Sequence, residues 1–372
     1  MLFTEARFAL LVVVSWIVWA NAPRRLRAAV LAASGAVFYA WYAPGSTLLV
    51  FALILAVYLP APRFWMLSAA IALSVLGYFK LPWTAGLLPI GLSFLTFELV
   101  SFAIDRSRGR TGDASIVDYL AFALFFPCRV AGPIKRFGDF RKAVAGATVS
   151  PANVYAGVVR VLVGVAKKVV LADSLGLTVS ELAYAATPMH ALKILLAYSA
   201  QIYLDFSAYS DMAIGVSRIF GIEIPENFNW PYLSDNIQEF WTRWHISLSS
   251  WVRDYIFMPV GARAFASPLR RRPMAIASLS YLASFLVVGA WHGLTANFLL
   301  WGLYHGVLLS GHHVYRRTVA ARLATNSLYQ STAVRAASIG VTFAFVTAGW
   351  ILFVTPNFTE AAHLAKLIMG LA

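Results

Sequence analysis

Charged residues are scarce in this sequence of 372 residues. Asp, Glu, Lys and Arg together make up 12% of it, whereas 60% of the residues are hydrophobic. A soluble domain usually carries about 25% charged and about 45–50% apolar residues. So few charges cannot cover the surface of a water-soluble molecule, which excludes an ordinary soluble enzyme or nucleic-acid-binding protein. The sequence therefore predicts an integral membrane protein.

Cysteine is almost absent as well. The single Cys128 cannot form an internal disulfide, and the sequence has neither the paired Cys and His spacing of a metal site nor a glycine-rich phosphate loop. No repeat and no Ser/Gly-rich linker divides the chain. These absences predict no metal site, no bound cofactor and a single membrane-embedded domain over residues 1–372.

Long apolar runs are abundant, and they are continuous rather than alternating. Backbone groups in lipid must be paired internally, so continuous runs favour helices over a barrel. A membrane-spanning helix needs about 20 residues, which leaves room for roughly ten, and shorter runs are expected to tilt, re-enter or lie in the interface. The first run ends near a signal-peptidase-like Ala20-Asn21-Ala22, but Pro23 and the arginines after it predict an uncleaved anchor. The runs cover residues 8–20, 28–42, 47–60, 64–79, 83–104, 116–131, 152–172, 191–220, 274–290, 294–313 and 336–354.

Basic residues exceed acidic ones, 30 against 16, which gives a formal net charge of +14. The positive-inside rule accounts for this excess in a membrane protein, so we expect no nucleic-acid partner. The clusters at 270–272 and 316–317 flank two apolar runs. If both clusters are cytoplasmic, the runs form a helical hairpin whose turn, near residues 290–293, lies deep in the membrane. An ionisable side chain is costly there, which makes His292 a functional candidate.

The run at 116–131 does not fit a simple crossing. Basic clusters flank it on both sides, and Pro127, Arg129 and Pro133 interrupt its end. Proline breaks helices, and irregular backbone at membrane depth is tolerated only where protein buries it. The pattern predicts a broken, re-entrant segment.

The stretch 223–263 is polar, aromatic and interrupted by prolines. On a helix, its polar and aromatic residues would separate onto two faces, which is typical of an interfacial amphipathic helix with an aromatic belt. His245 is then either a belt histidine or a group that contacts an anionic cytosolic donor. One face would hold Arg243, Ser247, Ser250 and Asp254, and the other Trp241, His245, Leu248, Val252 and Tyr255.

Other polar residues interrupt the apolar runs. His305 follows His292 by thirteen residues in a similar Gly-rich context. On a continuous helix the two would lie about 20 Å apart on differing faces, so at most one is expected at a given reaction centre. Glu98, Asp205 and Asp211 either mark an ion path or satisfy backbone groups at helix breaks.

Several sequence blocks together resemble the membrane-bound O-acyltransferase (MBOAT) family. The similarity is to its bacterial polysaccharide branch, which includes alginate O-acetylase, peptidoglycan O-acetyltransferase and the D-alanyl transfer protein of teichoic acids. The most specific feature is the block 227–255 followed by Trp291-His292-Gly293. In family order, the blocks are Pro89–Phe97, Phe125–Ile134, Ala166–Asp173, Asp205–Gly215, Asn227–Tyr232, Glu239–Tyr255, Gly289–Gly293 and Asn297–Gly306.

The resemblance implies an all-α polytopic fold. In it, a ring of transmembrane helices with re-entrant and interfacial helices surrounds a central tunnel. Residues 1–84 would be N-terminal spans, 85–310 the family core and 311–372 a short C-terminal part. The resemblance also implies that His292 is catalytic and that His245 is the second functional histidine.

Four further residues are expected near these histidines. Asn297 and Trp291 would support or orient His292, with Asn297 as a candidate oxyanion partner. Arg243 and Arg253 would attract the phosphates of the acyl donor, although positive-inside charge explains them equally well.

These features predict acyl transfer across a bacterial inner membrane by a multi-pass enzyme. A cytosolic thioester, acetyl-CoA or an acylated carrier protein, would give an acyl group, in the first instance acetyl, to a hydroxyl of an extracytoplasmic polysaccharide or cell-envelope glycan. His292 would act as general base, and a secreted or membrane-anchored acyltransferase would be a further partner. The alternatives are a lipid or protein acyltransferase of the same family, a transporter or export subunit with Glu98, Asp205 and Asp211 as a cation relay, and an inactive scaffold.

Overall fold

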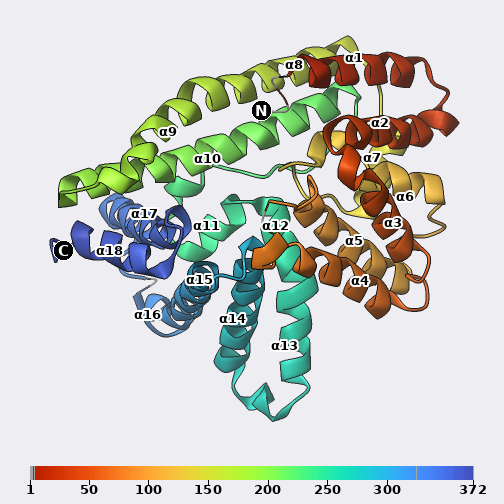
Figure 1. The fold of residues 1–372 in the computed structure, drawn as a ribbon. Coiled ribbons are helices and arrows are strands. Elements are labelled where there is room, and N and C mark those ends of the chain that lie inside the picture. Colours follow the sequence, from red (N-terminus) through yellow and green to blue (C-terminus); the bar gives the residue numbers. More distant parts are fainter. Residues whose placement is uncertain (1–2, 4, 85, 324, 372) are drawn as a thin grey trace. The chain divides into compact units, whose positions relative to one another are not determined.

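The computed structural model describes residues 3, 5–84, 86–323 and 325–371. Over these residues the chain forms helices, turns and loops and no strand, which confirms the all-α prediction. The chain divides into two compact units, each made of two segments: Met1–Val170 with Asp205–Glu226, and Leu171–Leu204 with Asn227–Ala372. One division of the chain, between Leu204 and Asp205, falls within the longest helix, α10 (Pro188–Ile219), which Figure 1 labels.

The first unit consists mainly of short helices. Proline and glycine interrupt its apolar sequence, so that α2 and α3 meet at an angle of 116°. In the same unit, α8 packs closely against α10, and Gly157 and Gly215 face each other at this contact. A β-carbon on either glycine would collide with the backbone of the other helix. The helices are α1 Ala6–Asn21, α2 Arg27–Tyr42, α3 Thr47–Tyr58, α4 Trp65–Tyr78, α5 Leu92–Ser107, α6 Ile116–Ala123, α7 Phe137–Gly146 and α8 Pro151–Ala166, followed by the C-terminal part of α10.

The predicted break near residues 116–131 is present. Helix α6 ends at Ala123, a single helical turn follows at Phe126–Cys128, and the chain then has no helix until Phe137. The broken backbone is confirmed, and re-entry into a bilayer stays a prediction.

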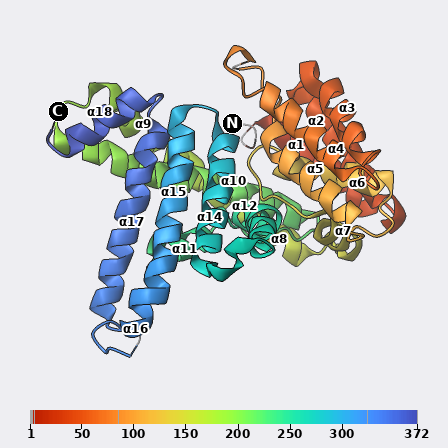
Figure 2. The same cartoon turned by 90° about the horizontal axis from the view of Figure 1, so that it is seen from below.

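The second unit contains the long helices α14, α15 and α17, which lie side by side (Figure 2). Short helices precede them and a final one packs at the end. The helices are α9 Asp173–Val179, α11 Ile237–Arg243, α12 Ile246–Val252, α13 Met258–Phe265, α14 Pro273–His292, α15 Ala296–Tyr315, α16 Ala321–Leu323, α17 Thr332–Val354 and α18 Phe358–Ile368.

The predicted hairpin at residues 274–313 is confirmed. Helix α14 ends at His292, the chain turns through Gly293–Thr295, and α15 returns along α14. A β-carbon at Gly289 would collide with the backbone of Phe298, and one at Gly302 with the backbone of Phe285. The two glycines therefore allow the helices to approach closely, as small residues do between membrane helices.

The prediction of a single amphipathic helix around His245 is wrong. Helix α11 ends at Arg243 and α12 begins at Ile246, with His245 between them in the left-handed backbone conformation at φ 44°. The two predicted faces are therefore not aligned on one axis. Trp241 and His245, expected in an aromatic belt, are buried in protein.

Membrane spans can be judged by length and composition. Within the described residues, two helices are long and apolar enough to cross a membrane, Pro273–His292 and Thr332–Val354, and the bent pair Arg24–Tyr42 with Pro44–Tyr58 would make a third. Other apolar helices, such as Ala6–Asn21 and Trp65–Tyr78, are shorter. The larger number of spans and the ring around a tunnel remain predictions.

Candidate active site

His292 is the last residue of α14, inside a cluster of aromatic rings. The centre of its imidazole lies 4.8 Å from that of Phe353, 5.3 Å from Trp301 and 5.9 Å from Phe298. Phe353 comes from α17 and the other two rings from α15. The hairpin and α17 thus hold His292 at a partly exposed position with its ring orientation restricted by packing.

His245 is buried and hydrogen-bonded through Asn227. The side-chain oxygen of Asn227 accepts bonds from the backbone N–H of Ser247 at 3.2 Å and from its hydroxyl at 2.8 Å. Since that atom is the acceptor, the His245 Nδ1 that lies 3.0 Å from it must carry the proton and donate. This arrangement selects the tautomer whose Nε2 holds the lone pair and can accept a proton.

The structure brings His245 and His292 into electrostatic reach of each other. Burial, and to a smaller extent the charge of His292, lowers the pKa of His245 to about 3. His245 is therefore neutral at physiological pH. Two histidines predicted from separate motifs thus belong to one site in the second unit.

Trp301 connects His292 to His305. Its ring centre lies 5.3 Å from that of His292 and 4.8 Å from that of His305. The expected 20 Å separation of the two histidines along one helix is wrong, because the turn at Gly293–Thr295 reverses the chain. His305 is fully buried, and Trp241 packs perpendicular to it at 5.2 Å.

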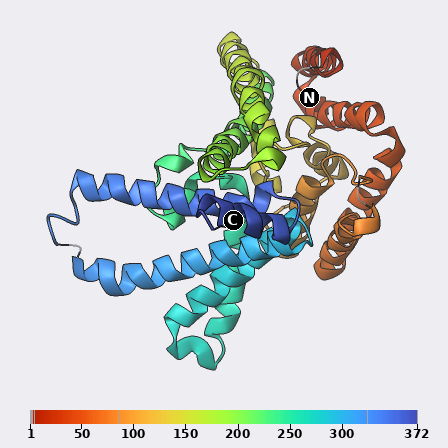
Figure 3. The same cartoon turned by 60° about the vertical axis from the view of Figure 1, so that its left-hand side comes forward.

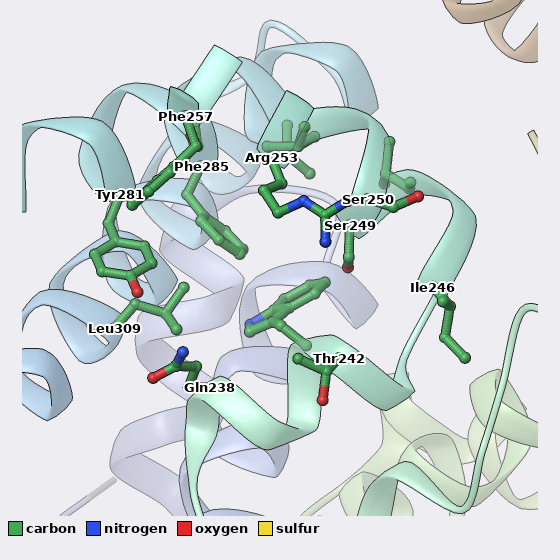
Figure 4. Close-up of a pocket in the computed structure, with 15 residues that line it drawn as sticks. Gln238, Thr242, Ile246, Ser249, Ser250, Arg253, Phe257, Tyr281, Phe285 and Leu309 are labelled. Carbon is green, nitrogen blue, oxygen red and sulfur yellow. The ribbon is translucent and has the colours of Figure 1, made fainter. Parts of the chain in front are cut away.

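Trp241 lines a pocket with a volume of about 320 Å³. Figure 4 shows the guanidinium of Arg253 and the ring of Phe285 pointing into it. Two of its buried lining groups, the indole N–H of Trp241 and the hydroxyl of Ser284, have no hydrogen-bond partner among the described residues. Buried polar groups normally have partners, so these two are suited to polar atoms of a ligand. The remaining lining residues are Gln238, Thr242, Ile246, Leu248, Ser249, Ser250, Val252, Phe257, Tyr281, Val288 and Leu309.

The two predicted donor-binding arginines differ in position. Arg253 lines the pocket and its side chain is 64% exposed, with Nε donating to Asp254 at 2.8 Å. Arg243 is outside the pocket lining and pairs with Glu239 of its own helix at 2.5 Å. Arg253 is therefore the better placed of the two to meet a ligand phosphate.

The two predicted supporting residues also differ. Trp291 packs beside His292 with ring centres 4.4 Å apart and ring planes tilted by 60°. The amide nitrogen of Asn297 donates to the carbonyl of Thr355 at 3.0 Å and so joins the start of α15 to the end of α17. An orienting or oxyanion role for either residue stays a prediction.

The carboxylates considered for a cation relay are all ion-paired, within the first unit. Glu98 is buried between Arg129 and Lys135. Asp211 pairs with Lys167 at 2.6 Å and with Arg160, and Asp205 pairs with Lys168 at 2.8 Å. Cations of the chain itself neutralise these groups, which argues against a relay for transported cations.

Possible metal ligands are scattered rather than grouped in the part of the chain that the structure describes. Over residues 3–371, apart from the undescribed positions, no group of three His, Cys, Asp or Glu residues could hold a metal ion. The lone Cys128 is buried.

Sequence reasoning missed three parts of the site. The role of Asn227, the contacts of Trp301 and the pocket beside Trp241 all depend on contacts between segments that are separate in the sequence. A signal did exist for Asn227, since it opens the Asn227–Tyr232 block that precedes His245.

A family model describes most of this chain. The model of the membrane-bound O-acyltransferase family, MBOAT, matches residues 64–353. This range includes both histidines, the pocket and the hairpin.

Curated relatives carry related names. The chain is 34% identical over 329 residues to the probable alginate O-acetylase AlgI of Pseudomonas syringae pv. tomato, covering 82% of this chain and 60% of the relative. It is 29% identical over 357 residues to the peptidoglycan O-acetyltransferase of Helicobacter pylori, covering 83% and 65%. It is 32% identical over 271 residues to the teichoic acid D-alanyltransferase of Bacillus subtilis, covering 71% and 68%. The chain thus spans about 60% of the length of the alginate O-acetylases it matches.

Proposed function

Because this chain belongs to the membrane-bound O-acyltransferase family, we propose that it transfers an acyl group, in the first instance acetyl, from a cytosolic thioester to a hydroxyl of an extracytoplasmic polysaccharide or cell-envelope glycan. The observation that carries the proposal is the grouping of His292, His245 and the pocket at Trp241 in one unit. The names of the relatives support a glycan acceptor. A bacterial inner membrane is the corresponding location.

In the proposed reaction, His292 takes the proton of the acceptor hydroxyl as general base. The hydroxyl oxygen attacks the thioester carbonyl, the carbon–sulfur bond breaks, and the thiolate leaves and is protonated. The products are an ester on the acceptor and a free thiol. General-base assistance of this kind contributes about 10²–10⁴-fold to the rate.

The pocket at Trp241 would receive the donor's thioester arm. Its apolar walls fit the arm's chain, and the indole N–H of Trp241 and the hydroxyl of Ser284 fit its carbonyl and amide groups. Arg253 would meet the phosphate. Acetyl-CoA and an acylated carrier protein share this arm, so both remain donors in the proposal, and a separate acyltransferase partner could take the group onward.

The test of the base is His292→Ala in protein reconstituted into vesicles. We expect transfer of label from acetyl-CoA or a loaded carrier protein to oligosaccharides to fall about 10²–10⁴-fold. The matched control is His363→Ala, an exposed histidine on α18. If both the His292 variant and the control transfer label at near-normal rates, His292 is not the general base.

The test of the donor pocket separates the two substrates. Arg253→Gln removes a partly exposed contact that contributes about 1 kcal/mol, so the donor KM should rise about fivefold with little change in the acceptor KM. His245→Ala should likewise weaken donor use more than acceptor use. Arg271→Gln, outside the pocket, serves as the control, and unchanged donor kinetics in both variants would exclude this pocket as the donor site.

A further inference from the structure

A second and larger cavity, whose lining includes neither His245 nor His292, lies between α15 and α17. It is a groove of about 1130 Å³ that runs along both helices toward the loop joining them. Figure 3 shows the two helices side by side up to this loop. None of the residues assigned above to catalysis or donor binding lines it.

One end of the groove is cationic. Arg316, at the end of α15, and Arg335, in the first turn of α17, both line it. Arg316 donates to the side-chain oxygen of Gln238 at 3.3 Å, but neither arginine forms an ion pair within the described chain. His312, one helical turn before Arg316, also lines the groove, and its buried Nε2 has no hydrogen-bond partner among the same residues. Asp235 also lines this end, so the two arginines and this carboxylate together give it a net charge of about +1.

The other end of the groove is apolar. Val307 and Leu308 of α15 face Val341 and Phe345 of α17 across it. Val307, Val341 and Phe345 remain 54%, 55% and 48% exposed although the helices are adjacent. A groove with a charged end and an apolar remainder fits a molecule with a charged head and a hydrocarbon tail.

The position of the cations relates the groove to a membrane. The hairpin makes α14 antiparallel to α15, and α17 returns along α15, so the start of α14, the end of α15 and the start of α17 lie at the same end of these helices. Arg270–Arg272, Arg316 and Arg335 occupy these positions. The positive-inside rule makes this side cytoplasmic. From Arg335 to Phe345 the helix rises about 15 Å, half of a hydrocarbon core of about 30 Å and thus the depth of one leaflet.

We propose that this groove binds one anionic glycerophospholipid of the cytoplasmic leaflet. Its phosphate lies between Arg316 and Arg335, with the Nε2–H of His312 donating to a phosphate oxygen, and an acyl chain follows the apolar end. Basic pockets between membrane helices on the cytoplasmic side are suited to such headgroups. Asp235 favours a headgroup that also carries hydroxyl donors, which is the chemistry of phosphatidylglycerol.

The experiment measures which lipid the full chain retains. The protein is equilibrated in mixed micelles of phosphatidylglycerol and phosphatidylcholine with identical acyl chains, and the retained lipid is identified by native mass spectrometry. Wild-type protein should retain phosphatidylglycerol in preference. An arginine near a membrane surface contributes about fivefold, so Arg316→Gln/Arg335→Gln should reduce the preference on the order of 25-fold.

Two further variants make the result specific. Val341→Trp fills the apolar end without changing charge and should also displace the lipid, and it keeps the test open if the double variant does not fold. Arg270→Gln/Arg271→Gln removes two cations on the same side but outside the groove and should retain the preference. Equal retention of both lipids by wild type, the same loss in the control variant, or displacement by inorganic phosphate alone would overturn the proposal.

Discussion

At the residue scale, His245 holds a backbone conformation that residues with a β-carbon rarely adopt. Its φ of 44° costs about 1–2 kcal/mol relative to the usual regions. Such strain persists where surrounding contacts over-determine it, and it occurs often at functional sites. Here the bonds through Asn227 hold the segment, so the same side chain fixes both the backbone and the tautomer.

The first prediction concerns Asn227. Asn227→Ala removes the acceptor of His245 and of both Ser247 donors, leaving buried groups that cost about 1–3 kcal/mol each. We expect a lower melting temperature and a reduced transfer rate, because the proton of His245 is no longer held on Nδ1. Thermal unfolding and transfer assays measure the two effects. Asn229→Ala, an exposed amide in the same loop, should change neither, and similar results for both variants would contradict the role.

The second prediction concerns pH. The pKa of His245 is about 3 in the folded chain and about 6.5 when unfolded, so acid protonates the unfolded chain first. His245 therefore contributes no pH dependence above about pH 7. Below pH 6.5 it lowers stability, with a limiting slope of about 1.4 kcal/mol per pH unit, until pH approaches 3. Thermal unfolding at several pH values should show a shallower acid loss in His245→Asn than in wild type.

A matched variant controls this measurement. His363 is exposed, so His363→Asn should keep the wild-type acid slope. An unchanged slope in His245→Asn would show that other groups carry the acid sensitivity.

Motifs identified the two main histidines but not their surroundings. His292 was predicted from charge clusters and His245 from an aromatic, polar segment; both belong to the second unit, and their functional roles stay predictions. The contact of Trp301 with both His292 and His305 was not predicted, although the hairpin was, because the rotation and packing of the two helices decide which side chains meet. The separation of about 20 Å applied the spacing of one continuous helix to residues on opposite sides of the turn.

At the element scale, the α14–α15 hairpin followed from sequence because charge and apolar length agree on it. The break between α11 and α12 did not, since helical spacing continues through residues 241–255 while the backbone at His245 turns left-handed. No glycine or proline marks that position. Tertiary contacts, with Asn227 foremost, overrode the local pattern.

The third prediction tests the close contact in this hairpin. A β-carbon at Gly302 would collide with the Phe285 backbone, whereas at Gly311 on the same helix nothing lies within 4 Å. Gly302→Ala should therefore destabilise the protein by about 1–3 kcal/mol. Gly311→Ala should stabilise it by about 0.5–1 kcal/mol through helix propensity. Thermal unfolding measures both changes in stability. If both variants shift the melting temperature in the same direction, the close approach at Gly302 does not control how α14 and α15 pack.

At the scale of the whole molecule, the surplus of positive charge is not uniform. In the first unit, Arg129, Lys135, Arg160, Lys167 and Lys168 pair with carboxylates. In the second unit, cations at the ends of α14, α15 and α17 lie on one side. The sequence predicted through the positive-inside rule that the clusters at 270–272 and 316–317 share a side, and it did not include Arg335. The ion pairs of the first unit join segments too distant for any sequence rule to connect.

The fourth prediction uses this asymmetry. Cys128 is buried, so native protein should give little background with a membrane-impermeant maleimide. Arg271→Cys should be labelled from the cytoplasmic side only, and Thr295→Cys, in the hairpin turn, should resist labelling from that side. Labelling of Arg271→Cys from outside would reverse the orientation assigned to the groove and to the donor pocket.

The shortness of many apolar helices has a consequence for the lipid around the protein. Helix α1 has 16 residues and α4 has 14, so they rise about 24 and 21 Å, less than a hydrocarbon core of about 30 Å. A bilayer meets such hydrophobic mismatch by thinning. In the proposed reaction, thinning next to the protein would shorten the path between a cytosolic thioester and an acceptor on the opposite surface, so that the lipid itself would be part of the catalytic geometry.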